Sequence, residues 1–163
     1  MEAAVATVVD EVVLRAATDA DRELLLAVYA STRAAELDQV AWPPGAREAF
    51  LEMQFSAQDA EYHRVNPNAS FDVIEVGGVA AGRVYVDRQP GEIRIIDLAL
   101  LPDFRGVGIG GRLLSGLLEE ASGSGSKVTL HVEATNRAGR LYERLGFVVV
   151  AEQGFHRRME WTR

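Results

Sequence analysis

The chain has 163 residues, enough for one domain with a buried core, and 48% of its residues are hydrophobic while 25% are charged. This composition argues against disordered and collagen-like proteins, and no apolar stretch approaches the roughly 18 residues of a membrane span. Cysteine is absent, which excludes disulfide scaffolds, cysteine zinc sites and a thiol nucleophile. The three histidines, His63, His131 and His156, lie far apart in the sequence, so no metal site is expected.

The net charge of −7 is unevenly distributed. Residues 1–75 carry 14 acids against five arginines, whereas residues 76–163 carry 10 acids against 12 bases. A negative chain argues against nucleic acid as the main partner, because contacts to phosphate supply most of that affinity. Either the two halves are ordinary solvated surfaces, or the second holds a phosphorylated ligand while the first attracts a cation. The acidic start lacks the basic residues of a signal peptide, so we expect a cytoplasmic protein without a membrane partner.

The first 65 residues predict one strand followed by two helices. Thr18 with Asp21 three residues later is typical of a helix N-cap. The segment Trp42-Pro43-Pro44-Gly45 predicts a turn and a helix start. The expected elements are a strand over Glu11–Ala16 and helices over Asp19–Arg33 and Ala46–His63.

After residue 68 the hydrophobic pattern changes from a helical period to alternation, which predicts strands. We expect strands over Phe71–Val76, Val79–Val86, Glu92–Leu101 and Lys127–Glu133, a pair within Phe147–Trp161, and helices ending near Ala121 and spanning Arg137–Leu145. Ser122 to Ser126 is expected to be a flexible connection. The order β-α-α-β-β-β-α-β-α-β-β indicates a single α/β (α+β) domain over residues 1–163 with a mixed sheet. The crossover after residue 101 should be right-handed, which makes the strands that it joins parallel.

The loop between Leu100 and Arg112 is rich in glycine, at positions 106, 108, 110 and 111. Glycine lets the backbone approach a ligand, and unpaired amides at the start of the next helix carry the positive end of its dipole. Together they favour binding of a pyrophosphate. The match of Gly106-x-Gly108-x-x-Gly111 to a dinucleotide fingerprint is weak, because the acid expected about 20 residues on is missing. A tight turn without a ligand stays open as an alternative.

Two motifs in this half resemble those of the GCN5-related N-acetyltransferase (GNAT) family. Arg105-x-x-Gly108-x-Gly110 matches the family's Arg/Gln-x-x-Gly-x-Gly/Ala signature, and residues 136–147 resemble its second motif, Asn…Ala…Leu-Tyr…Gly-Phe. The resemblance covers about residues 12–161, although residues 34–70 match only in helix placement. It implies the GNAT fold, a mixed and mostly antiparallel sheet whose central parallel strands splay and are flanked by helices.

The resemblance also implies acetyl-CoA as the acyl donor, with no metal. It places backbone contacts to the pantetheine arm at Leu98, Ala99 and Leu100, with the Leu100 amide directed at the thioester oxygen, and a further contact at Asn136. The residues that it places around the pyrophosphate are Arg105, Gly106, Val107, Gly108, Ile109, Gly110 and Gly111.

For catalysis, the resemblance implies that Tyr142 donates a proton to the departing thiolate, whereas the alternative is a tyrosine that only packs under the sheet. The base is less clear from the pattern, since the strand positions where several members carry an acid or histidine hold Ile96 and Arg94 here. Other members place a glutamate where this chain has His131, whose ordinary pKa of about 6.5 suits a base. Glu133 lies on the same strand face and could orient it. Proton loss through ordered water is the alternative.

The acyl acceptor stays open, because the clues conflict. Asp97 occupies a place where some members hold the ammonium of the acceptor, or it pairs with a neighbouring arginine. Arg94 would instead suit a carboxylate, and Gln54 and Gln58 are polar residues beside an apolar helical stripe, so each faces the pocket or is tied into the core.

The expected function is transfer of an acetyl group from CoA to a primary amine of a small molecule by direct attack. The alternatives are a protein or peptide N-acetyltransferase and a non-catalytic acyl-CoA sensor. A nicotinamide-binding oxidoreductase is a further alternative. A homodimer is compatible with the sequence.

Overall fold

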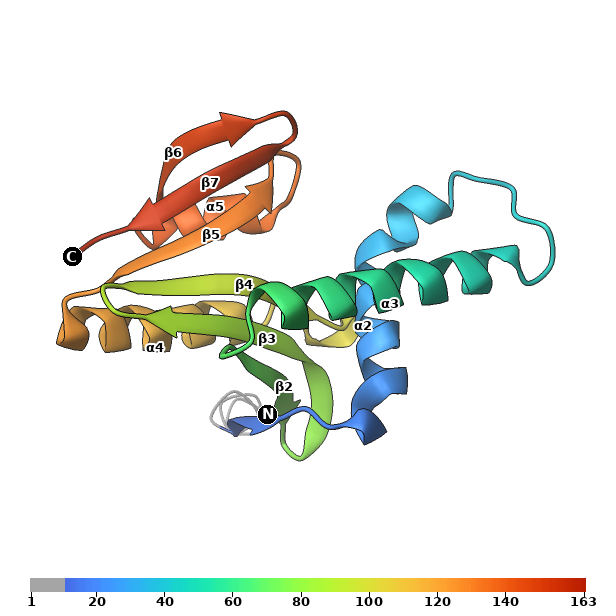
Figure 1. The fold of residues 1–163 in the computed structure, drawn as a ribbon, viewed down its shortest axis with the longest axis horizontal. Coiled ribbons are helices and arrows are strands. Elements are labelled where there is room, and N and C mark those ends of the chain that lie inside the picture. Colours follow the sequence, from blue (N-terminus) through green and yellow to red (C-terminus); the bar gives the residue numbers. More distant parts are fainter. Residues whose placement is uncertain (1–10) are drawn as a thin grey trace.

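The computed structural model describes residues 11–163, which form one mixed sheet with helices on both faces (Figure 1). The acidic start of the chain up to residue 10, on which the expectation about a signal peptide depends, lies outside the described residues. The elements are β1 (Val12–Ala16), the 3-10 turn η1 (Asp19–Asp21), α2 (Arg22–Leu37), α3 (Ala46–Val65), β2 (Ser70–Val76), β3 (Val79–Gln89), β4 (Glu92–Leu100), the 3-10 turn η2 (Pro102–Phe104), α4 (Ile109–Ser124), β5 (Lys127–Glu133), α5 (Ala138–Arg144), β6 (Val148–Gln153) and β7 (His156–Trp161).

The sheet has seven strands in the order β1-β2-β3-β4-β5-β7-β6. Only the central pair β4–β5 is parallel, and the other neighbours are antiparallel. The expected element order and the parallel central pair are therefore confirmed. No helix within residues 11–163 is long and apolar enough to cross a membrane.

Two apolar clusters lie on opposite faces of this sheet. Val73 and Ile74 are successive residues of β2 and belong to different clusters, as expected when neighbouring side chains point to opposite faces of a strand. The larger cluster joins the central strands to α4 and α5, through residues such as Leu114 and Tyr142. The smaller one joins β2 to α2 and α3, through residues such as Tyr29 and Phe55.

The two central strands separate towards their carboxyl ends. Their ladder begins with Glu92 opposite Lys127 and ends with Ile95 opposite Leu130, whereas β4 continues to Leu100 and β5 to Glu133. A bulge in β4 falls where they part, since Tyr85 of β3 faces Asp97 while the next residue, Val86, faces Ile95, which leaves Ile96 unpaired. The splayed central strands implied by the resemblance are present.

Beyond the bulge, β4 is held unusually close to β3. Gly82 is paired with Leu100, and a Cβ atom built on Gly82 would lie 2.1 Å from the Ala99 carbonyl oxygen and 2.9 Å from the Leu100 Cα. Both neighbours are backbone atoms, which cannot rotate away. Only glycine therefore allows the strands to approach in this way.

Several boundaries differ from those expected; for example, α2 extends to Leu37 and β3 to Gln89. The first helix begins as the 3-10 turn η1, because the Asp21 carboxylate bonds the Thr18 amide at 2.8 Å and the Arg15 guanidinium at 2.8 and 2.9 Å. The segment that we expected to be flexible from Ser122 is instead helical up to Ser124, so that expectation was wrong.

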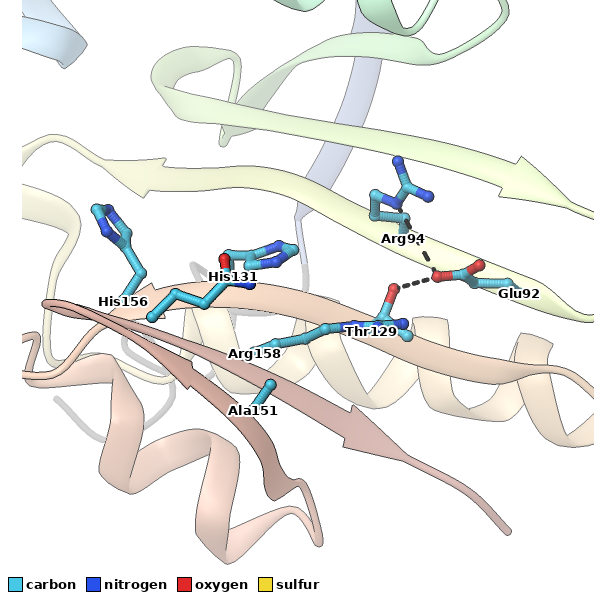
Figure 2. Close-up of a pocket in the computed structure, with 8 residues that line it drawn as sticks. Glu92, Arg94, Thr129, His131, Ala151, His156 and Arg158 are labelled. Atoms are coloured by element: carbon cyan, nitrogen blue, oxygen red, sulfur yellow. Dashed lines mark hydrogen bonds and ion pairs between the residues drawn. The ribbon is translucent and has the colours of Figure 1, made fainter.

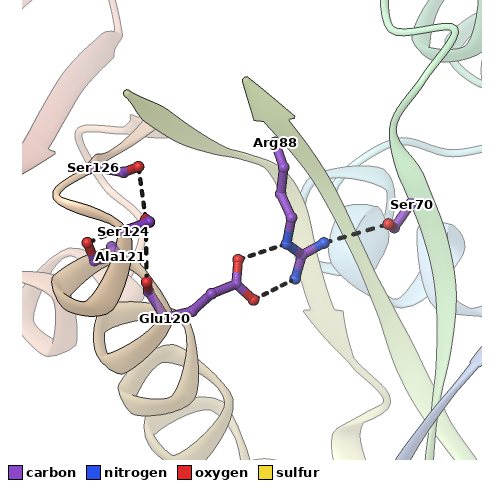
Figure 3. A network of polar contacts seen from close by, with 6 residues as sticks. All are labelled: Ser70, Arg88, Glu120, Ala121, Ser124 and Ser126. Atoms are coloured by element: carbon purple, nitrogen blue, oxygen red, sulfur yellow. Dashed lines mark hydrogen bonds and ion pairs between the residues drawn. The ribbon is translucent and has the colours of Figure 1, made fainter. Parts of the chain in front are cut away.

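Polar contacts explain why the serine-glycine segment is ordered. The Ser124 hydroxyl bonds the Glu120 and Ala121 carbonyls at 3.2 and 3.3 Å and lies 2.8 Å from the Ser126 hydroxyl (Figure 3). Arg88 of β3 contacts the Glu120 carboxylate at 2.6 and 3.1 Å and so joins the sheet to the end of α4.

Candidate functional site

A cleft of about 780 Å³ lies where β4 and β5 separate, and α2 and α3 form its other wall. Helix α2 contributes Tyr29 and Arg33, and helix α3 contributes Gln58 and Tyr62. The sheet side consists of β4 from Arg94 to Ala99, of β5 from His131 to Glu133, and of Asn136 and His156 beyond them. The cleft has the size of a small-molecule site.

The centre of the cleft holds a buried ion pair. The side chain of Arg83, on β3, is 3% exposed, and its Nε lies 2.5 Å from the Asp97 carboxylate while its other end bonds the Gln58 carbonyl oxygen at 2.9 Å. The guanidinium also lies over the Tyr85 ring, 5.0 Å from its centroid. Burial raises the pKa of the Asp97 carboxyl, against the opposing attraction of Arg83. Three elements, α3, β3 and β4, are therefore joined at this point.

The ring of Tyr142 is buried beneath the cleft, in edge-to-face contact with Phe147 at 5.7 Å between centroids. Burial, with a smaller contribution from the Asp97 charge, raises its pKa to about 12. Tyr142 is not among the residues that line the cleft, but its charge interaction with Asp97 places it near that carboxylate. Within residues 11–163 no fully buried side-chain N or O atom lacks a hydrogen-bond partner. Since no such bond to the Tyr142 hydroxyl is found there, the hydroxyl oxygen is not fully buried.

His131 lies on β5 just beyond the last residue paired with β4, and it lines the cleft. Burial and the positive charges of Arg158, Arg94 and His156 lower the pKa of its imidazole. The imidazole is therefore neutral at neutral pH. Glu133 also lines the cleft, but within residues 11–163 no hydrogen bond or ion pair joins its carboxylate to His131.

The edge of β4 that faces the gap has backbone groups without a strand partner, although the Leu98 amide bonds the Asp97 carboxylate. The Leu101 amide donates to the Ala81 carbonyl at 2.8 Å, so alternation along an antiparallel pair directs the Leu98 and Leu100 amides to the opposite edge. Because the β4–β5 ladder has already ended at Ile95, that edge is not occupied by β5. The backbone amide of Ala99 instead points towards β3, where Ala99 is paired with Arg83.

The glycine loop follows directly and leads into α4. Gly106 and Gly108 adopt φ of 75° and 89°, and a Cβ on either would meet no atom within 4 Å, so the space above them is open. The first backbone bond of α4 runs from the Arg112 amide to the Gly108 carbonyl at 3.1 Å. The amides of residues 109–111 therefore have no acceptor within the helix and carry its positive dipole end.

Some side chains near the loop have structural partners. Arg105 donates to the Leu100 carbonyl at 2.9 Å and to the Ser31 hydroxyl of α2 at 3.1 Å. Val107 is 48% exposed. The Asn136 side chain lines the cleft and accepts a bond from the Ala138 amide at 2.9 Å, at the start of α5.

The structure thus brings all but one of the residues expected at the acceptor site to one place. Asp97, Arg94, His131 and Glu133 line the cleft, whereas Gln54 does not, and its neighbour one turn later, Gln58, does. Within residues 11–163 no group of three or more His, Cys, Asp or Glu residues is placed to hold a metal ion.

Sequence reasoning missed Arg83, the most buried charge of the site. The sequence feature that could have indicated this residue is that it is the one arginine within the apolar run Val79 to Val86. Side chains of such a strand are usually packed in the core, so a buried charge there is unusual. The α2 residues Tyr29 and Arg33 were also missed, because their positions fit an ordinary amphipathic helix.

A sheet whose central parallel strands part beside a glycine-rich helix start defines the fold of acyl-CoA-dependent acyltransferases of the GNAT class. The chain belongs to the acetyltransferase (GNAT) family, which it matches over residues 28–147. A comparison with curated proteins found no match.

Solved structures show the same fold at low sequence identity. The PaiA N-acetyltransferase of Thermoplasma acidophilum, in complex with coenzyme A, superposes with a TM-score of 0.69 at 18% identity, over 93% of this chain and 99% of that one. PH1933 of Pyrococcus horikoshii gives 0.69 at 20%, over 94% and 99% of the two chains. An acetyltransferase of Thermus thermophilus gives 0.68 at 19%, over 93% and 97%.

Proposed function

We propose that this protein transfers the acetyl group of acetyl-CoA to a primary amine of a small molecule bound in the cleft between α2, α3 and the splayed strands. The observation that carries the proposal is the gap between β4 and β5, which joins an amide-lined strand edge to a cleft with titratable side chains. Membership of the acetyltransferase family supports the reaction class.

The residues present fit coenzyme A. The open loop over Gly106 and Gly108, with the free amides at the start of α4, would hold the pyrophosphate. The Leu98 and Leu100 amides and Asn136 would hold the amide-rich pantetheine arm. When bound, acetyl-CoA supplies an acetyl group as a thioester, whose carbon–sulfur bond breaks as the acceptor nitrogen bonds to the acetyl carbon.

In this proposal Tyr142 donates a proton to the departing sulfur. Its pKa of about 12 keeps the hydroxyl protonated at neutral pH, so it can donate to a negatively charged sulfur. The same shift makes it a weaker acid than an ordinary tyrosine. We therefore expect its contribution to lie at the low end of the range for general acids, about 10²-fold.

The acceptor amine must lose a proton before it attacks, since its ordinary pKa of about 10 keeps it charged at neutral pH. His131 is the proposed base, because its lowered pKa leaves the imidazole neutral and it lines the cleft where the strands part. Asp97, which Arg83 holds in place, would attract the ammonium form of the acceptor, and Glu133 would add negative charge at the rim.

The test is thiol release from acetyl-CoA with a broad panel of amines and peptides, with products identified by mass spectrometry. We expect an N-acetylated small amine and little turnover of peptide N-termini. A peptide that reacts faster than every small amine would show that the acceptor is a peptide. CoA binding without any acetylated product would indicate a sensor.

A further inference from the structure

A second hollow of about 370 Å³ continues from the cleft along the same face of β4, β5 and β7 (Figure 2). Arg94, His131 and His156 line both spaces, so the two are continuous. The neighbouring strand residues on the other face, such as Leu130, are buried in the core beside α4. The hollow, which we call the β4–β7 groove, is therefore a polar extension of the acceptor cleft.

The β4–β7 groove is positive in a chain whose net charge is −7. Arg94 and Arg158 line it from β4 and β7, on either side of His131, and His131 is the direct strand partner of Arg158. Figure 2 shows their side chains and that of His156 around one space. Among the described residues that line it, the only carboxylate is that of Glu92.

The carboxylates that contact these arginines are either loosely placed or shared with another basic side chain. Glu92 accepts a bond from the Thr129 hydroxyl at 2.7 Å and lies 3.9 Å from the Arg94 guanidinium, which is a loose contact. Glu160 is shared between Arg158 at 3.0 Å and Lys127 at 3.2 Å. Among residues 11–163, these contacts therefore join three basic side chains to two carboxylates. Burial is the main cause of the lowered pKa of His131, and the positive charges of Arg158, Arg94 and His156 lower it further.

We propose that the amine acceptor also carries a carboxylate, which binds Arg94 and Arg158 in the β4–β7 groove while its amine lies beside His131. This inference rests on the proposed function, and it narrows the substrate class to amino acids and similar amino-carboxylates. Arginine suits this role because its planar guanidinium can bond both oxygens of a carboxylate. A peptide N-terminus, which has no carboxylate close to its amine, fits the groove poorly.

The test compares matched acceptors that differ only in the carboxylate: phenylalanine against phenylalaninamide, and lysine against cadaverine. An α-carboxamide makes the amine less basic and so more available for attack, which means that a preference for phenylalanine over phenylalaninamide cannot come from the nucleophile. We expect kcat/KM to be higher for the acid of each pair. Equal or faster turnover of phenylalaninamide overturns the proposal.

A matched pair of variants assigns the effect to the groove. Arg158→Gln should raise the KM for phenylalanine about 10- to 100-fold, as expected for loss of a charge-assisted bond, and leave that for phenylalaninamide little changed. Arg157→Gln is the control, since Arg157 is the next residue of β7, does not line the groove and has a side chain as exposed as that of Arg158, at 39%. Equal losses in both variants, or for both acceptors, contradict the assignment.

A binding measurement separates this inference from the proposed function. 3-Phenylpropionate, which has the carboxylate but no amine, should bind the intact protein saturably in ligand-detected NMR in the presence of CoA. Arg158→Gln should abolish that binding and Arg157→Gln should not. If no amine is acetylated but the probe binds in this pattern, the proposed function fails while the carboxylate site stands; if the probe does not bind the wild type, the site fails.

Discussion

Replacing Gly82 by alanine tests whether the end of β4 is held in place by its close approach to β3. The added Cβ would lie 2.1 Å from the Ala99 carbonyl oxygen and 2.9 Å from the Leu100 Cα. Since both are backbone atoms, the strands must move apart. The backbone conformation of Gly82 is not the obstacle, because its φ is not in the positive region.

The magnitude follows from the cost of overpacking. Forcing an extra methyl group into a well-packed site typically costs about 1–3 kcal/mol, and a contact against backbone belongs at the upper end of that range. The displaced segment includes the Leu100 amide, which faces the gap between β4 and β5. We therefore expect Gly82→Ala to lower the free energy of unfolding by about 3 kcal/mol and to weaken CoA binding as well.

The assay is urea denaturation for stability, with calorimetry of CoA binding under conditions where both proteins are folded. Gly116→Ala is the control, since Gly116 is exposed on α4 and its added Cβ would meet nothing within 4 Å. Alanine there should stabilise the protein by about 0.5–1 kcal/mol, because glycine is unfavourable within a helix. A Gly82→Ala protein as stable as the wild type, with unchanged CoA affinity, would refute the reasoning.

Three further predictions concern the cleft. Tyr142→Phe should lower kcat about 10²-fold and leave CoA affinity unchanged in calorimetry; an unchanged kcat removes the tyrosine from catalysis. Wild-type kcat/KM should rise with pH through a pKa below about 6.5, since the pKa of His131 is lowered. His131→Gln should lose this rise at low pH. If the variant and the wild type have identical profiles between pH 5 and 9, His131 is not the base. Asp97→Asn should lower the free energy of unfolding by roughly 3 kcal/mol in urea titrations, because Arg83 is left buried without its counter-charge. A loss below about 1 kcal/mol would show that the ion pair contributes little to stability.

Local patterns in the sequence were sufficient for the order of the elements and for the position of the glycine loop. Alternation and helical periods mark the strands and helices directly, and glycine at positions 106 and 108 is required by the positive φ values found there. The family motifs then implied the splayed strands, which the β4–β5 ladder confirms by ending at Ile95.

The interior of the cleft could not be predicted in this way, because it depends on contacts between distant segments. Arg83 and Gln58 meet although 25 residues separate them, and nothing local distinguishes Gln58 from Gln54. The bulge at Ile96 determines which β4 side chains face the cleft. No glycine or proline within β4 indicates this bulge in the sequence. The order of the Ser122–Ser124 segment likewise comes from hydroxyl bonds to carbonyls of the preceding turn.

The central claim is that coenzyme A binds along the free edge of β4 and at the start of α4. Hydrogen exchange of the backbone amides, with and without CoA, tests it most directly. The account predicts that added CoA slows exchange at Leu100 and at Ile109, Gly110 and Gly111, whose amides have no acceptor among residues 11–163. Unchanged exchange at these four amides under saturating CoA, or protection confined to another part of the molecule, would contradict it.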